Sequence, residues 1–119
     1  MSETITDIES QKEFIDLLNK NKGVIVVKLG AEWCGPCKII ENEVHDFFDK
    51  APPNMTTVNL DVDESFDIYA NLKRKKIVTA IPALLCYKKS NRDIIPDDVL
   101  IGADKEQLKQ FFDRCLASI

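Results

Sequence analysis

The order of hydrophobic and polar positions predicts helices and strands that alternate along the chain. Ser10 and Glu13 have the spacing of a capping box, and apolar residues follow at helical intervals until Gly23 ends the segment. Residues 24–29 are mostly apolar and rich in β-branched side chains. They predict a strand buried on both faces, because the apolar positions are not confined to every second residue.

The middle of the chain predicts a second helix, a second strand and a third helix. Residues 37–50 place large apolar side chains on one helical stripe, and the two prolines that follow cannot continue a helix. Residues 55–62 have the β-branched content of a strand. Asp63 or Ser65 can cap the next helix, whose basic end at residues 73–76 suits the helix dipole.

The last third of the chain predicts two strands and a final helix. Residues 83–87 and 99–101 read as strands joined by a long hairpin loop, Gly102 ends the second strand, and Asp104 starts the helix. This order favours parallel pairing between strands that a helix separates and antiparallel pairing in the closing hairpin. Since the chain has no repeat and no linker, residues 1–119 are expected to form a single α/β domain.

Composition narrows the class of protein. Of the 119 residues, 45% are hydrophobic and 30% are charged, which is the balance of a globular domain rather than a disordered chain. The net charge of −4 argues against a nucleic-acid partner, and no apolar run approaches the roughly 18 residues of a membrane helix. The acidic N-terminus has neither a basic nor an apolar leader region, so we expect a reducing, cytoplasmic compartment.

The stretch Ala31-Glu-Trp-Cys-Gly-Pro-Cys-Lys38 holds the candidate chemistry, between a buried strand and a helix. Cysteines three residues apart on a first helical turn are close enough to form a disulfide. Cys34 is expected at the exposed helix start, where unpaired N–H groups lower a thiol pKa from about 8.5. Cys37 lies one turn further in as the resolving thiol. Gly35 keeps bulk away from the sulfurs, and Pro36 fixes the first turn.

Other interpretations of the four cysteines remain open. Zinc needs four ligands, whereas one Cys-x-x-Cys supplies two, and the remaining candidates His45, Cys86 and Cys115 are not paired at ligand spacing. Cys86 falls inside a predicted strand and Cys115 on an apolar helix face. Both are interpreted as core residues, with a regulatory or intermolecular thiol as the alternative.

The stretch around the cysteine pair resembles the active-site signature of the thioredoxin family. Ile81 and Pro82, just before a strand, resemble the segment that holds the family's cis-proline, and Gly102 matches the glycine beside its substrate groove. The resemblance implies a thioredoxin fold, with a mixed sheet of four to five strands flanked by helices. It also implies that a cis Ile81–Pro82 bond faces the disulfide and exposes the Ile81 backbone to an extended substrate. Trp33 is expected to be an exposed recognition residue, with a core aromatic as the alternative.

The chain departs from the family pattern at four positions. The family's buried Asp is Lys28, its partner Lys on the next strand is Asn59, its helix-kinking Pro is Asn42, and the Thr after the cis-proline is Ala83. A charged Lys28 would favour the active-site thiolate and make the protein a weaker reductant. The alternative is that Lys28 extends to solvent and changes nothing.

The resemblance implies a monomeric redox carrier that reduces protein disulfides and needs no bound cofactor. Cys34 attacks the substrate disulfide, Cys37 resolves the mixed disulfide, and an NADPH-dependent thioredoxin reductase supplies electrons. An adaptor that binds peptides, with secondary redox activity, is the alternative that Lys28 and Asn59 keep open. An oxidase or isomerase would need an oxidising compartment.

Overall fold

A four-stranded mixed sheet forms the middle of the molecule in the computed structural model, which describes residues 3–119. The strand order is β2-β1-β3-β4. The strands are β1 (Val24–Gly30), β2 (Met55–Asp61), β3 (Ala83–Lys88) and β4 (Asp98–Ile101). Ile5 adds an isolated parallel bridge to Val58, so the N-terminal segment lies along the outer edge of β2.

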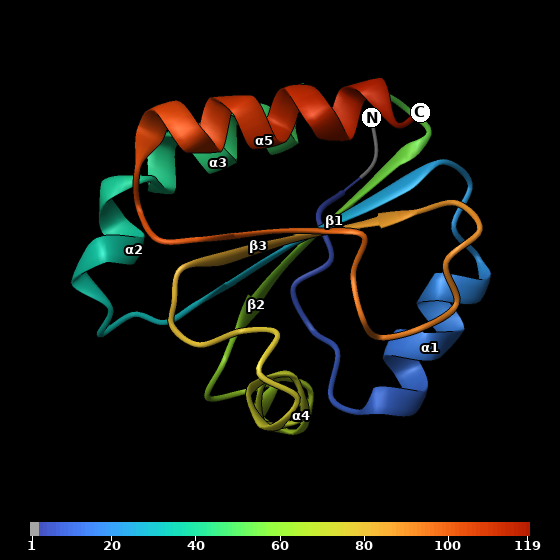
Figure 1. Cartoon of the computed structure of the whole chain (residues 1–119), viewed down its shortest axis with the longest axis horizontal. Helices are drawn as coiled ribbons and strands as arrows, with labels where there is room; N and C mark the ends of the chain where they lie inside the picture. Colours follow the sequence, from blue (N-terminus) through green and yellow to red (C-terminus); the bar gives the residue numbers. More distant parts are fainter. Residues whose placement is uncertain (1–2) are drawn as a thin grey trace.

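Helices cover both faces of the sheet, as Figure 1 shows. They are α1 (Gln11–Asn19), α2 (Gly35–Ile39), α3 (Glu41–Asp49), α4 (Phe66–Arg74) and α5 (Lys105–Ala117). Helices α1 and α4 bury apolar side chains in one core cluster, and α3 and α5 bury theirs in a second cluster on the opposite face. The α/β class and the mixed sheet predicted from the sequence are therefore confirmed. Within residues 3–119 no helix is long and apolar enough to cross a membrane.

Strand β1 lies between the two clusters and is buried along its whole length, as predicted. Its side chains alternate between the faces: Ile25, Val27 and Leu29 belong to the α1–α4 side, and Val24 and Val26 to the α3–α5 side. The next position in the second series is a lysine. Lys28 therefore lies in a buried strand whose other side chains are apolar.

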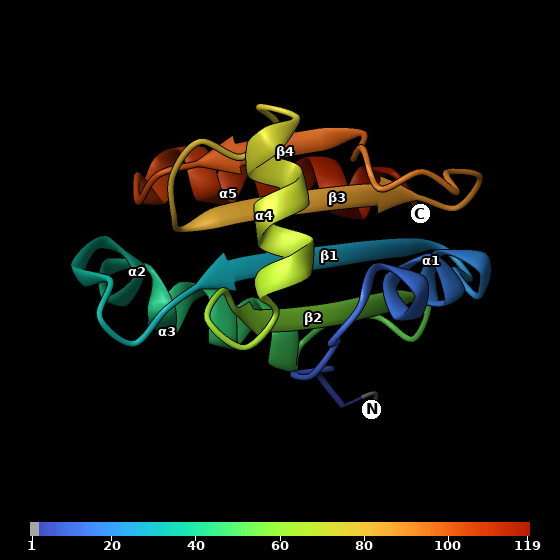
Figure 2. The same ribbon diagram turned by 90° about the horizontal axis from the view of Figure 1, so that it is seen from below.

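The pairing of β3 differs from the prediction. Strands β1 and β2 are parallel and β3 and β4 are antiparallel, as expected, but β3 is antiparallel to β1 although a helix precedes it. Helix α4 crosses the strands instead of running back along them (Figure 2). Strand β3 therefore begins beside the C-terminal end of β1, which places Ala83 opposite Leu29.

The predicted helix at residues 37–50 is two helices. Helix α2 begins at Gly35, earlier than predicted, and a break at Ile40 (φ −104°, ψ 4°) separates it from α3. Asn42 stands where the family has a kinking proline, so this break forms without one. Ile40 itself is fully buried, which anchors the junction of the two helices in the core.

Two local predictions at α1 have different outcomes. Ser10 caps the helix as predicted, because its side chain accepts a hydrogen bond from the Glu13 N–H at 3.2 Å. Gly23 does not end the helix, which stops at Asn19. It is required by a close approach instead, since a Cβ there would collide with the Asn54 carbonyl oxygen.

Candidate active site

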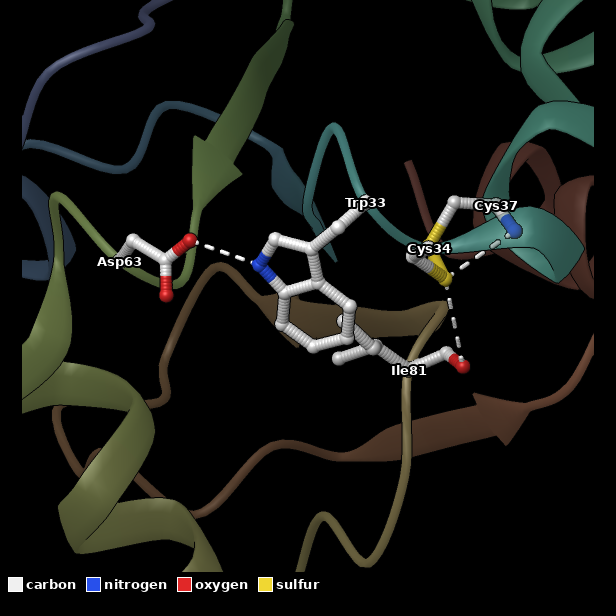
Figure 3. Close-up of a disulfide and its surroundings, with 5 residues drawn as sticks. All are labelled: Trp33, Cys34, Cys37, Asp63 and Ile81. Carbon is white, nitrogen blue, oxygen red and sulfur yellow. Dashed lines mark hydrogen bonds between the residues drawn. A yellow bond between two sulfur atoms is a disulfide. The ribbon is translucent and has the colours of Figure 1, made fainter.

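Cys34 and Cys37 form a disulfide where β1 leads into α2, with their Cα atoms 5.3 Å apart (Figure 3). Cys34 is the N-cap of α2, and its Sγ accepts a hydrogen bond from the Cys37 N–H at 3.2 Å. Pro36 occupies the first turn, and a Cβ at Gly35 would meet no atom within 4 Å. The bonded pair predicted from the spacing is confirmed, and nothing bulky stands beside Gly35.

The two cysteine residues are equally buried but have different surroundings. Each cysteine is 4% exposed, so the exposed position predicted for Cys34 is wrong in this oxidised state. The reason is that the Cys34 Sγ lies 3.8 Å from the Ile81 carbonyl oxygen, under the loop that precedes β3. The Cys37 Sγ faces inward instead, 3.4 Å from the point where a Cβ on Gly30 would stand.

The loop before β3 has the predicted cis peptide bond between Ile81 and Pro82. The Gly102 N–H donates a hydrogen bond to the Pro82 carbonyl oxygen at 2.9 Å, and Gly102 has a φ of 108° that favours glycine. No backbone hydrogen bond among residues 3–119 uses the Ile81 N–H. The structure therefore brings these three residues together beside Cys34.

Trp33 has the exposed position that the sequence favoured, with 67% of its surface accessible. Its indole N–H donates a hydrogen bond of 2.8 Å to the Asp63 carboxylate, which holds the ring beside the disulfide (Figure 3). The sequence interpretation missed this contact, because it treated Asp63 only as a helix cap. Ser65 is the N-cap of α4, and no sequence signal connects Trp33 with a residue thirty positions away.

Lys28 lies behind the disulfide, in the wall of an open cavity of about 670 Å³ that Cys37, Glu41 and Asn59 also line. Only 8% of Lys28 is exposed. Burial lowers the pKa of Lys28, and the nearby Glu41 carboxylate opposes that shift. Its Nζ lies 3.6 Å from the Cβ position of Gly30, the same point that the Cys37 Sγ approaches.

Glu41 was missed by the sequence interpretation, which named only the active-site thiolates as anions for Lys28. Glu41 is the first residue of α3, four positions after Cys37. In the single helix predicted for residues 37–50 that spacing places both residues on one side, so it was the available signal. The carboxylate reduces the net positive charge that Lys28 can present to the sulfurs.

The remaining candidates lie away from the disulfide. Cys86 and Cys115 are free and buried, which confirms their predicted core positions. His45 is exposed and lies 3.6 Å from the Asp49 carboxylate. Within residues 3–119 no group of three or more His, Cys, Asp or Glu side chains is placed to hold a metal ion.

Comparisons with known proteins agree with this geometry. The family profile described as Thioredoxin matches residues 5–114. Thioredoxin 1 of Plasmodium falciparum is 31% identical over 110 residues, which cover 92% of this chain and 96% of that protein. Thioredoxin of Equus caballus is 32% identical over 106 residues, which cover 88% and 92%.

Solved structures give the same result. A Plasmodium falciparum thioredoxin structure superposes with a TM-score of 0.72 at 29% identity and covers 93% of this chain and 98% of its own. The structure of Fasciola hepatica thioredoxin gives a TM-score of 0.72 at 25% identity, with the same coverage.

Proposed function

The chain belongs to the thioredoxin family and is a thiol–disulfide oxidoreductase, and we propose that Cys34 is its nucleophile and Cys37 its resolving thiol. The observation that carries these roles is the hydrogen bond from the Cys37 N–H to the Cys34 Sγ. A backbone donor at this distance stabilises negative charge on Cys34 once the disulfide is reduced. Cys37 has no equivalent donor among the described residues.

The reaction proceeds in two exchanges. The Cys34 thiolate attacks one sulfur of the substrate disulfide, a mixed disulfide forms, and the second substrate sulfur leaves with the electron pair and takes a proton. Cys37 then loses its proton and attacks the Cys34 sulfur. The remaining substrate sulfur leaves as a thiolate, and the Cys34–Cys37 disulfide seen in the structure is restored.

We propose that the substrate lies extended across the loop before β3. The Ile81 carbonyl oxygen is 3.8 Å from the Cys34 Sγ, so a segment paired with the Ile81 backbone would carry its own sulfur to Cys34. Pro82 and Gly102 hold that loop in place through their 2.9 Å hydrogen bond. Trp33 offers an exposed ring beside the disulfide (Figure 3).

Lys28 is proposed to tune the redox potential from behind Cys37. A positive charge there favours the thiolate form of the reduced pair and has less effect on the neutral disulfide. It therefore stabilises the reduced protein and makes it a weaker reductant. The Glu41 carboxylate limits this effect, because it neutralises part of the charge.

Thioredoxins act on disulfide substrates and are reduced by thioredoxin reductase. For this chain we propose an NADPH-dependent reductase as the electron donor, a monomer as the working form, and a reducing, cytoplasmic compartment. The Cys-Gly-Pro-Cys motif supports the need for an electron donor, because its Cys34–Cys37 disulfide must be reduced before the protein can reduce a substrate.

The test is catalysed reduction of a protein disulfide by dithiothreitol, compared between the wild type and Cys34→Ser. The wild type should accelerate the reduction, and Cys34→Ser should not exceed the uncatalysed rate. Cys86→Ala, which removes a thiol remote from the site, should stay active. A wild type that binds the disulfide substrate without accelerating its reduction would instead establish the peptide-binding adaptor.

A further inference from the structure

A second pair of cysteines lies in the core, on the α3–α5 side of the sheet. Cys86 is on β3 and is 2% exposed, and Cys115 is on α5 and is fully buried. Both belong to the same core cluster, which does not include the active-site cysteines. The exchange reaction described above uses neither of them.

The fold brings these two residues together from distant parts of the chain. Cys86 is paired in the sheet with Asp98 of β4. The Asp98 carboxylate accepts hydrogen bonds from the Arg114 Nε at 2.7 Å and from a second guanidinium nitrogen at 3.2 Å. Arg114 immediately precedes Cys115, so this two-point ion pair holds the last turn of α5 against the strand beside Cys86.

Cys86 and Asp98 are directly opposite on antiparallel strands, so their side chains lie on the face that α5 covers, where Cys115 is buried in the same cluster. A hydrogen bond with the Cys115 thiol lowers the pKa of Cys86, against the opposing effects of burial and of the Asp98 and Asp97 carboxylates, while the same hydrogen bond and burial raise the pKa of Cys115. Cys86 is thus the sulfur that gives up a proton more readily, and Cys115 is the donor that stabilises it.

We propose that Cys86 and Cys115 form a second redox couple, which closes to a buried disulfide between β3 and α5 when a hydroperoxide oxidises the protein. The first requirement for such a bond is proximity, which the shared position of Cys86 and Cys115 between β3 and α5 provides. Hydrogen peroxide is close to water in size and can reach a core that larger thiol reagents cannot enter.

The oxidation balances in two steps. The Cys86 thiolate attacks one oxygen of the peroxide and breaks the O–O bond. Cys86 becomes a sulfenic acid, and the other oxygen leaves as water after taking up a proton. The Cys115 thiol then attacks the Cys86 sulfur, a second water leaves, and the disulfide forms. Two thiols lose two electrons and the peroxide gains them.

Oxidation of Cys86 and Cys115 would have two effects that oxidation of the active site alone does not have. The fully oxidised chain would store two disulfides, and complete reduction would consume twice the reductant. The new bond would also link β3 to α5, and a crosslink between distant residues restricts the unfolded chain and raises the melting temperature.

The test uses the full chain with Cys34→Ser and Cys37→Ser, so that only the core pair can react and the result does not depend on the exchange activity. The folded variant is treated with hydrogen peroxide, unfolded in the presence of an alkylating reagent, and analysed by mass spectrometry. The expected product is a monomer that has lost two hydrogen atoms and both alkylation sites, with Cys86 linked to Cys115 in the peptide map. Its melting temperature should rise by roughly 5–10 °C.

A matched control adds Cys115→Ala to the same background, which leaves Cys86 without its partner. This variant should gain oxygen atoms on Cys86 and form no internal crosslink. The proposal is overturned if the Cys86 and Cys115 thiols both survive peroxide, if they gain oxygen without joining, or if they join only between molecules. A crosslinked product with an unchanged melting temperature would overturn the proposed stabilisation by the crosslink.

Discussion

Lys28 places a cationic side chain inside the central strand, opposite Asn59 of β2. Its burial lowers its pKa, and the Glu41 carboxylate opposes this shift. A charge in this position lies close enough to the Cys37 side of the disulfide to act on the reduced pair. The charge state of Lys28, inside the sheet, therefore affects the redox chemistry of the Cys34–Cys37 pair at the end of β1.

Removal of this charge should change the redox potential. We predict that Lys28→Met lowers the potential by roughly 20–45 mV, the equivalent of about 1–2 kcal/mol for a two-electron couple. The pKa of Cys34 should rise at the same time, because its thiolate loses a favourable neighbour. Equilibration with glutathione buffers and a thiolate absorbance titration measure the two quantities.

Lys109→Met is the matched control for this prediction, since it removes an exposed lysine on α5, away from the disulfide. It should leave both quantities unchanged. If Lys28→Met also leaves them unchanged, Lys28 plays no part in the redox chemistry.

The same lysine makes a prediction about stability and pH. The pKa of Lys28 is lower in the folded protein than its ordinary value of 10.5, so the unfolded chain binds more protons between those two values. The free energy of unfolding therefore rises with pH in this window as the buried cation loses its charge. We predict that Lys28→Met is more stable than the wild type near neutral pH and that this advantage shrinks toward about pH 10. Urea unfolding of both proteins measures it, and an advantage that grows with pH would contradict the assignment.

At the scale of the elements, the corner between β4 and α5 sets the position of the loop before β3. Gly102 occupies this corner with a φ of 108°, and its N–H holds the Pro82 carbonyl oxygen. A Cβ on Gly102 would meet no atom within 4 Å, so an alanine there is opposed by backbone conformation and not by a collision. The corner therefore depends on glycine for its conformation alone.

This dependence predicts that Gly102→Ala lowers the free energy of unfolding by about 1–2 kcal/mol, the cost of a left-handed conformation for a residue with a side chain. Gly35→Ala is the matched control, because that site is equally open but does not have a positive φ. Chemical denaturation of both reduced proteins compares them. Equal stability of the two variants would show that the corner does not require glycine.

The sequence predicted the elements better than the way they meet. The capped start of α1 at Ser10 and the buried strand β1 follow from local residue patterns, which the structure confirms. The break at Ile40 could not be predicted, because its backbone departs only modestly from a helix and no proline or glycine marks it. The direction of β3 depends on the path of α4 across the sheet, which local patterns do not encode.

The active site shows the same division. The motif predicted Cys34 and Cys37, and the resemblance predicted the cis bond at Pro82. The contacts of Trp33 with Asp63 and of Cys86 with Cys115 join residues that are far apart in the chain. They exist only because the sheet and its helices bring those segments together, so they required the structure.

At the scale of the whole molecule, the four cysteines fall into two groups. Cys34 and Cys37 form the disulfide at the end of β1, and Cys86 and Cys115 are free thiols in the core. Both core clusters use side chains of β1, so one strand joins the two sides of the sheet. The fold therefore separates two kinds of thiol within one structural unit.

This separation predicts how the reduced, folded protein reacts with iodoacetamide. Cys34 should be labelled rapidly, because the Cys37 N–H stabilises its thiolate at the start of α2. Cys86 and Cys115, which lie inside the core between the sheet and α5, should be labelled only after denaturation. Peptide mass spectrometry over a time course gives the rate for each cysteine. Rapid labelling of either core thiol in the folded protein would contradict the structure.

The central claim is that Cys34 attacks the substrate and Cys37 completes the exchange, and trapping of the mixed disulfide tests it most directly. Reduced Cys37→Ser and reduced Cys34→Ser are each mixed with a disulfide-bonded protein substrate, quenched with acid and mapped by mass spectrometry. The account predicts that Cys37→Ser accumulates a stable adduct on Cys34 and that Cys34→Ser forms little or none. An adduct that forms faster on Cys37 in the Cys34→Ser protein would contradict it.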